Sequence, residues 1–189
     1  MKRLAVYCGA SMGADPLFAE TARALGREMA ARGIDLVYGG GHRGLMGVVA
    51  DAVLANGGRA VGVIPHALVE LEVAHTGLTE LHKVASMHER KAKMTELTDA
   101  FIAIPGGIGT LDELFEAWTW NALGYHSKPF CLLNVAGFWD GLIGFIDHVT
   151  ESGFLSPARR QQLITADGIG EAIEKLDEAI EAAETKMVW

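Results

Sequence analysis

The chain has 189 residues, of which 50% are hydrophobic and 21% are charged, and its formal net charge at pH 7 is −8. This length and composition predict one packed domain over residues 1–189. The negative charge argues against a general nucleic-acid-binding surface and against an anionic-membrane surface, and no apolar run is long enough to span a bilayer, so neither nucleic acid nor membrane is an expected partner.

The first residues are predicted to form a buried strand. The apolar run LAVYC (4–8) follows two basic residues, but Gly9 and a turn break it too early for a signal peptide. Cys8 and Cys131 both fall in predicted buried strands. A disulfide between them is the alternative, but reduced core thiols are the expectation, and with them a cytoplasmic location.

Short apolar runs alternate with helical patterns along the whole chain. Strands are predicted at 4–8, 34–38, 60–64, 100–104 and 130–135, with a further short strand within TELHKVA (79–85). Helices are predicted through the spacing of Phe18, Ala22, Leu25 and Met29, up to Asn56, over 87–97, up to Leu123, over 139–151 and over 170–184. This alternation predicts an α/β fold, a Rossmann-like three-layer sandwich with a mostly parallel central sheet flanked by helices on both faces.

Three predicted strands run directly into glycine-rich turns, at 9–13, 39–44 and 106–109. In parallel α/β folds ligands bind outside the carboxyl ends of the strands, which is where these turns fall. Glycine allows another group to approach the backbone closely, and the amides at a helix start favour an anion. Each turn alone is explained by tight strand-to-helix packing. Together at one edge they predict an anion site, with phosphate as the natural ligand.

Two better-known nucleotide motifs are absent. GGGHRG (39–44) fits the dinucleotide pattern, but it follows the second strand, and the third strand ends in IPH (64–66), where an acidic residue should hold the ribose. No lysine follows the glycines at the place that a P-loop requires. The seven histidines show no metal-ligand spacing and are expected to be scattered. We therefore expect no nicotinamide cofactor, no other cofactor and no metal.

The segment PGGIGTLDE (105–113) resembles the signature Pro-Gly-Gly-x-Gly-Thr-x-x-Glu of the Lonely Guy family, phosphoribohydrolases that release the base from cytokinin nucleotides. MHERK (87–91) resembles the family's second signature, an Arg-Lys pair after a Met. The stretch 39–47, which ends in GLMG, and the opening CGAS (8–11) are also similar to the family. The resemblance extends over about residues 4–155.

This resemblance implies hydrolysis of the N-glycosidic bond of nucleoside 5′-monophosphates, AMP and N6-substituted cytokinin nucleotides, to free base and ribose 5-phosphate. It implies Arg90 and Glu113 as catalytic residues, and it implies a homodimer. The implied substrate contacts are Ser11, Gly41, Met87, Lys91, Gly106, Gly107, Ile108, Gly109, Thr110, Leu111, Asp112 and Thr119. Plant members carry a substrate-binding Glu just after the proline of the third strand, whereas here the segment PHALVELEVAHTG (65–77) is longer and offers no clear equivalent.

Each implied catalytic residue also has a purely structural explanation. Thr110 and Glu113 form a Thr-x-x-Glu pattern, which is a capping box when it stands at a helix start. Arg90 and Lys91 lie on one predicted helix face with Met87 and Met94, and this could be a solvated basic face. In the catalytic interpretation Glu113 stabilises an oxocarbenium-like sugar, Arg90 positions the nucleotide and keeps Glu113 ionised, and the glycine loop with Thr110 anchors the 5′-phosphate.

Two further expectations concern family labels and the helix after the glycine loop. Proteins of this family have been labelled lysine decarboxylases, but no lysine here has a recognisable Schiff-base setting. Carriers of molybdenum cofactor have a similar fold, and cofactor binding is the alternative function.

The helix after the glycine loop is predicted to turn one apolar stripe toward the sheet, formed by Leu111, Leu114, Phe115 and Trp118. Trp120 lies about 200° away from Trp118, so either a second subunit or another helix of the chain is expected to cover it.

Overall fold

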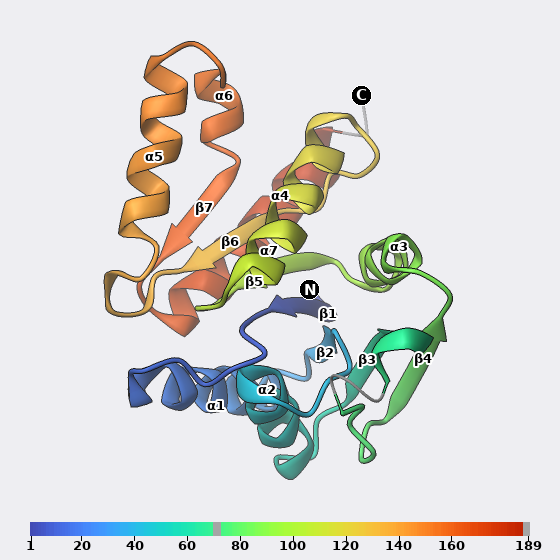
Figure 1. Cartoon of the computed structure of the whole chain (residues 1–189). Helices are drawn as coiled ribbons and strands as arrows, with labels where there is room; N and C mark the ends of the chain where they lie inside the picture. The colour runs from blue at the N-terminus through green and yellow to red at the C-terminus, as the bar shows by residue number, and fades with distance from the viewer. Residues whose placement is uncertain (70–72, 187–189) are drawn as a thin grey trace.

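Seven parallel strands form the centre of the molecule, in the order β4-β3-β2-β1-β5-β6-β7 (Figure 1). The computed structural model describes residues 1–69 and 73–186. The strands are β1 (Arg3–Tyr7), β2 (Asp35–Tyr38), β3 (Ala60–Pro65), β4 (Glu80–Val84), β5 (Ala100–Ala103), β6 (Phe130–Leu133) and β7 (Leu163–Ala166). Every neighbouring pair is parallel, which confirms the predicted fold class.

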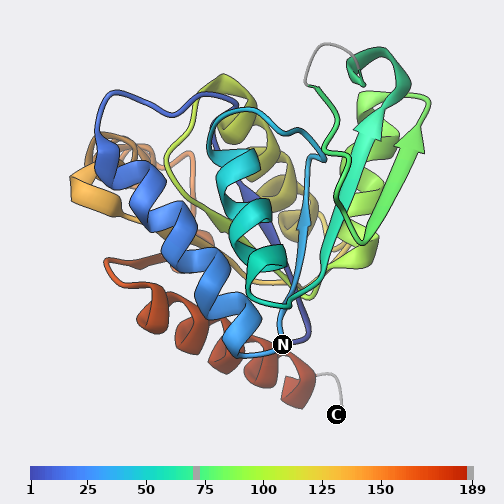
Figure 2. The ribbon, with the colours of Figure 1, turned by 90° about the horizontal axis from the view of Figure 1, so that it is seen from below.

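Helices cover both faces of the sheet. They are α1 (Pro16–Ala31), α2 (Gly44–Ala55), α3 (Met87–Leu97), α4 (Ile108–Ala122), α5 (Asp140–Glu151), α6 (Pro157–Arg160) and α7 (Ile169–Lys186), with short 3-10 turns η1 (His66–Leu68) and η2 (Val135–Gly137). Helices α1, α2 and α7 pack on one face, as the view from below shows (Figure 2). Helices α3, α4 and α5 pack on the other face, where Met94, Trp118 and Ile146 are buried.

The order of the strands reverses at β1. After β1 the chain builds β2, β3 and β4 outward on one side, and it then returns to place β5 against the other side of β1. Leu4 pairs with Ala100 and Tyr7 pairs with Ala103. The loops that leave β1 and β5 therefore emerge side by side at the carboxyl edge of the sheet, and such a switch point is where α/β folds bind ligands.

The sequence predicted which helices and strands are present better than it predicted the residues at which they end. The strand that we predicted at 130–135 ends at Leu133, and β7 with α6 was not predicted at all. The sequence of β7 is only four residues long and half-buried at the edge of the sheet, so it carries no continuous apolar run. In α4 the expected sheet-facing stripe is wrong at Phe115, which is 38% exposed, whereas Leu114 and Trp118 are buried.

Both cysteines are buried free thiols, as expected. Burial raises the pKa of Cys131 to about 12, so its thiol stays protonated near neutral pH. Among the described residues, none of the helices is both long and apolar enough to cross a bilayer.

A half-buried histidine makes the stability of the fold depend on pH. Burial, and then the positive charge of Lys128, lower the pKa of His126 to about 4 from 6.5. The unfolded chain therefore takes up a proton that the folded chain does not, and stability falls as the pH drops from about 6.5 to about 4. After solvent screening we expect this residue to contribute a loss of about 1 to 2 kcal/mol.

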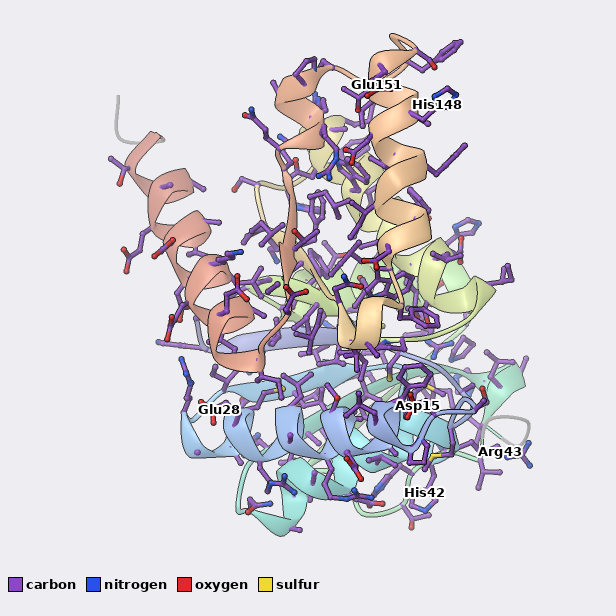
Figure 3. All side chains as sticks on the ribbon, turned by 90° about the vertical axis from the view of Figure 1, so that its left-hand side faces the viewer. Asp15, Glu28, His42, Arg43, His148 and Glu151 are labelled. Carbon is purple, nitrogen blue, oxygen red and sulfur yellow. The ribbon has the colours of Figure 1, made fainter. Side chains whose placement is uncertain are left out.

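Urea unfolding at pH 7 and pH 4.5 measures this effect in His126→Asn, because asparagine keeps an acceptor for the Lys128 amide that now donates to the ring. The variant is expected to lose less stability on acidification than the wild type. His148→Asn, at an exposed position of α5 (Figure 3), is the control and should retain the wild-type dependence. Equal acid sensitivity of His126→Asn and the wild type would contradict the assignment.

Candidate active site

A cavity of about 400 Å³ opens at the carboxyl ends of β1 and β5. It is lined by Cys8, Gly9, Ala10, Ser11, Met46, Met87, Arg90, Gly107, Gly109, Thr110, Asp112 and Glu113. The residues come from the loop after β1, from the start of α2, from α3 and from the start of α4. The structure thus brings eight of the predicted site residues to one cavity: Ser11, Met87, Arg90, Gly107, Gly109, Thr110, Asp112 and Glu113.

The three glycine-rich turns meet at this cavity. The Gly9 amide donates to the carbonyl of Pro105 at 3.1 Å, and the Leu45 amide donates to the carbonyl of Gly9 at 3.0 Å. A Cβ on Gly44, whose φ is +59°, would lie 2.3 Å from the Ser11 nitrogen. The missing side chains therefore let the three loops touch one another, as the sequence predicted.

The N-terminus of α4 faces the cavity without a side-chain cap. Gly107 is the N-cap residue, and the first intrahelical bond runs from the Leu111 amide to the Gly107 carbonyl at 3.1 Å. The capping-box explanation of Thr110 and Glu113 is therefore wrong, because both residues lie inside the helix. The amides that precede this first bond point out of the helix end, which is the usual arrangement for holding an anion.

Arg90 is buried in the cavity wall. A local cap starts its helix, since Ser86 accepts from the Glu89 amide at 3.1 Å and Glu89 accepts from the Ala85 amide at 2.8 Å. One turn in, the Arg90 side chain is only 4% exposed, and its Nη2 donates to the carbonyl of Gly39 at 3.0 Å. The solvated basic face is therefore the wrong explanation for Arg90. A Cβ on Gly39 would lie 2.0 Å from that same Nη2, so a larger residue at position 39 would displace the guanidinium from this contact.

Lys91 points to a different set of partners. Its Nζ pairs with Asp112 at 2.8 Å and with Glu116 at 3.0 Å, both on α4. Burial lowers the pKa of Lys91, but the two hydrogen-bonded carboxylates outweigh burial and leave the pKa above its ordinary value. The ammonium ties α3 to α4 and offsets negative charge beside Glu113.

The Glu113 carboxylate acts electrostatically on two buried groups, Cys8 and Tyr7. Burial first, and then the Glu113 charge, raise the pKa of the Cys8 thiol. Burial, Glu113 and Glu116 together raise the pKa of Tyr7 well above its ordinary value. Both groups therefore stay neutral and add no negative charge to the surroundings of the carboxylate.

Six of the predicted contacts lie outside the cavity lining: Gly41, Lys91, Gly106, Ile108, Leu111 and Thr119. Ile108 is 82% exposed, and Thr119 lines a separate apolar groove between α4 and α5. Cys8, Gly9, Ala10 and Met46 line the cavity although we did not predict them as contacts. These four residues lie in the segments CGAS (8–11) and GLMG (44–47), whose similarity to the family could have identified them as contacts. Residues 70–72 of the segment 65–77 lie outside the described part of the chain.

The histidines are not all scattered. Ligand atoms of His42, Asp51 and His75 lie within 4.8 Å of one another. The sequence gave no sign of this, because the three residues come from a loop, a helix and a second loop. His42 directly follows the glycine run 39–41, and none of the three cluster residues lines the cavity.

An uncapped helix end, a buried arginine and a carboxylate meet around one cavity at the switch point of the parallel sheet. This arrangement is typical of proteins that bind phosphorylated small molecules. A protein-family model described as "Possible lysine decarboxylase" matches residues 46–176. Cytokinin riboside 5'-monophosphate phosphoribohydrolase LOG3 of Arabidopsis thaliana is 45% identical over 100% of this chain and 89% of its own length.

The enzyme of the same activity named LOG in Oryza sativa subsp. japonica is 46% identical, over 100% of this chain and 78% of its own length. The chain therefore belongs to the Lonely Guy family. The molybdenum cofactor binding protein of Rippkaea orientalis superposes with a TM-score of 0.72 at 21% identity, covering 95% of this chain and 97% of its own, and this likeness shows the fold alone.

Two adjacent glycines at the mouth of α4 differ sharply in the space around them. A Cβ on Gly106 would lie 2.1 Å from Thr110 Oγ1 and 2.9 Å from the Gly9 nitrogen, whereas a Cβ on Gly107 would meet nothing within 4 Å. Gly106→Ala is therefore expected to destabilise the fold by about 1 to 3 kcal/mol in urea unfolding. Gly107→Ala is the matched control, and because it loses only the preference of an N-cap for glycine over alanine, it should cost less than Gly106→Ala, about 1 kcal/mol at most. Equal losses in the two variants would refute the packing around Gly106.

Proposed function

We propose that this protein hydrolyses the N-glycosidic bond of nucleoside 5′-monophosphates, AMP and N6-substituted cytokinin nucleotides, and releases free base and ribose 5-phosphate. The observation that carries the proposal is the meeting of Arg90, Glu113 and the open N-terminus of α4 in one cavity. Two relatives that match over 100% of this chain, at 45% and 46% identity, are phosphoribohydrolases by name.

Each of the three parts of the cavity has its own role in the reaction. The helix end at Gly107 holds the 5′-phosphate, so that remote binding orients the bond to be broken. As the bond between C1′ and the base nitrogen breaks, its electron pair leaves with the base and positive charge builds on the ribose. The Glu113 carboxylate stabilises that charge and orients the water that attacks C1′. Arg90, fixed by the Gly39 carbonyl, balances the negative charge of phosphate and carboxylate.

The two rival functions have weaker support. Lysine decarboxylation would need a lysine able to form a Schiff base, but Lys91, beside the cavity, has a raised pKa and is held as an ammonium by two carboxylates. The molybdenum cofactor binding protein shares the fold at 21% identity, and a shared fold does not transfer a function.

We also propose that the protein is a cytoplasmic homodimer. The two buried free thiols support a reducing compartment. An apolar groove of about 380 Å³ between α4 and α5 is lined by Trp118, Thr119, Phe145 and Phe154 among others. Phe145 is 61% exposed and Phe154 is 88% exposed. Exposed aromatic patches mark interaction surfaces, and a second copy of this chain is the occupant that the family resemblance implies.

The phosphate requirement is the most direct test of the substrate class. With AMP the protein should release adenine, whereas adenosine lacks the group that the α4 N-terminus holds. Losing this anchor is expected to cost about 2 to 4 kcal/mol, which is roughly 30- to 900-fold in kcat/KM. Chromatography of free base over a panel of nucleotides and nucleosides gives the ratio. Equal turnover of AMP and adenosine would remove the phosphate anchor from the mechanism.

The role of Glu113 is tested by removing its charge while keeping its shape. Because Glu113 lies inside α4, Glu113→Gln should leave folding intact and still bind AMP, but base release should fall about 100-fold or more. Glu116→Gln, a carboxylate one turn away on the same helix, is the matched control and should keep turnover within a few fold. Near-normal activity of Glu113→Gln would show that another group stabilises the developing charge.

The dimer proposal is tested by placing a charge on the groove. Phe145→Glu is expected to convert a dimer to a folded monomer in sedimentation velocity, since the chain is already negatively charged and the partner presents the same surface. Leu17→Glu, at a 40% exposed position of α1 on the opposite face, is the control and should leave the dimer unchanged. A dimer that persists in Phe145→Glu would place the subunit contact elsewhere.

A further inference from the structure

A short strap, defined as Val73–His75, lies along the glycine run 39–41 and the His42 that follows it. The His42 amide donates to the carbonyl of Val73, and the His75 amide donates to the carbonyl of Gly40, both at 2.9 Å. Between these two bonds Gly41 and Ala74 form an antiparallel bridge. The strap therefore pairs with the loop whose first residue, Gly39, holds Arg90.

The side chain of His75 ties this strap to α2. The ring is 7% exposed, its Nε2 lies 2.9 Å from Asp51 Oδ1, and its Nδ1 accepts from the Gly77 amide at 3.0 Å. The ring of His42 packs edge-on against the ring of His75, with centroids 4.6 Å apart. Both ring nitrogens are therefore engaged, and the imidazole joins a helix, the strap and the next loop.

These bonds also decide between a metal site and a structural tie. A nitrogen that accepts from an amide carries no proton, so in the neutral ring the proton lies on Nε2 and is donated to Asp51. A metal ion would need the Nε2 lone pair, and it would move the proton to Nδ1, against the Gly77 N–H. The local hydrogen bonds thus oppose a metal, although three ligand atoms lie close together.

The backbone of the strap is strained at Val73. Its φ is +49°, a conformation that a β-branched residue rarely adopts. A residue keeps such a backbone conformation only where several contacts with its neighbours hold it there, and such residues are common near functional sites. Here the surroundings are the pairing with His42 on one side and the His75 tie two residues later.

We propose that His75 is a positioning residue for the reaction: by locking the strap onto the glycine run, it holds the Gly39 carbonyl in the place that fixes Arg90. This proposal rests on the function proposed above. The phosphate site at the start of α4 does not depend on the strap, so loosening the strap should affect turnover more than phosphate binding.

The test removes the partner of His75 rather than any residue of the cavity. Asp51→Ala should lower kcat for base release from AMP about tenfold, because a small displacement of a catalytic group is costly. Its affinity for inorganic phosphate should stay within about twofold. Asp51→Asn keeps an oxygen that accepts from Nε2 and should stay within about threefold of the wild-type kcat. Glu28→Ala removes an exposed ion pair at the far end of α1 (Figure 3) and should have no effect.

Two results would overturn the proposal. The first is a wild-type kcat in Asp51→Ala. The second is an Asp51→Asn variant as impaired as Asp51→Ala, together with a wild type that EDTA inactivates and Zn²⁺ restores, since that pattern requires a bound metal.

Amide hydrogen exchange separates this proposal from the function on which it rests. In Asp51→Ala the His42 and His75 amides should exchange about tenfold faster than in the wild type, whether or not a substrate has been found. A wild type that releases no base from any nucleotide would refute the proposed function. Unchanged exchange at these two amides would refute the role of His75.

Discussion

The buried guanidinium of Arg90 is the constraint around which the site is arranged. A cation that is 4% exposed must be held by hydrogen bonds and nearby negative charge, because burying an uncompensated charge is costly. The Gly39 carbonyl supplies one such bond. That contact requires a glycine at 39, a loop that turns sharply after β2, and a helix α3 that starts one turn before Arg90. Two separate segments of sequence, the loop after β2 and helix α3, therefore serve one side chain.

The carboxylates near the cavity are likewise balanced by one side chain, that of Lys91. Glu113 stands beside the place that we assign to a phosphate, and Asp112 and Glu116 lie on the same helix. Lys91 pairs with the latter two at 2.8 Å and 3.0 Å. The neighbouring pair of basic residues thus has divided roles. Arg90 serves the cavity, whereas Lys91 neutralises the carboxylates around it and fastens α3 to α4.

The sequence predicted the fold class, the meeting of the three glycine turns and most of the cavity lining, because strand alternation and glycine position are local signals. It did not predict β7, whose four residues carry too little apolar pattern. The sequence could not decide whether Thr110 caps the helix, since only the backbone conformation shows that the helix begins after Gly107. The cluster of His42, Asp51 and His75 depends on the contact between His75 and Asp51, which are 24 positions apart, and spacing in the chain carries no sign of such a contact.

The pairing of β1 with β5 has a consequence for how the protein acquires its site. Leu4 and Ala100 are partners in the sheet although they stand far apart in the chain. Contacts of such long sequence separation form late and slow folding, because the loop they close must first lose its entropy. A growing chain that has completed only the first four strands lacks part of the cavity wall, since the loop after β5 and the start of α4 are not yet made. The cavity is therefore complete only when the second half of the sheet docks on the first.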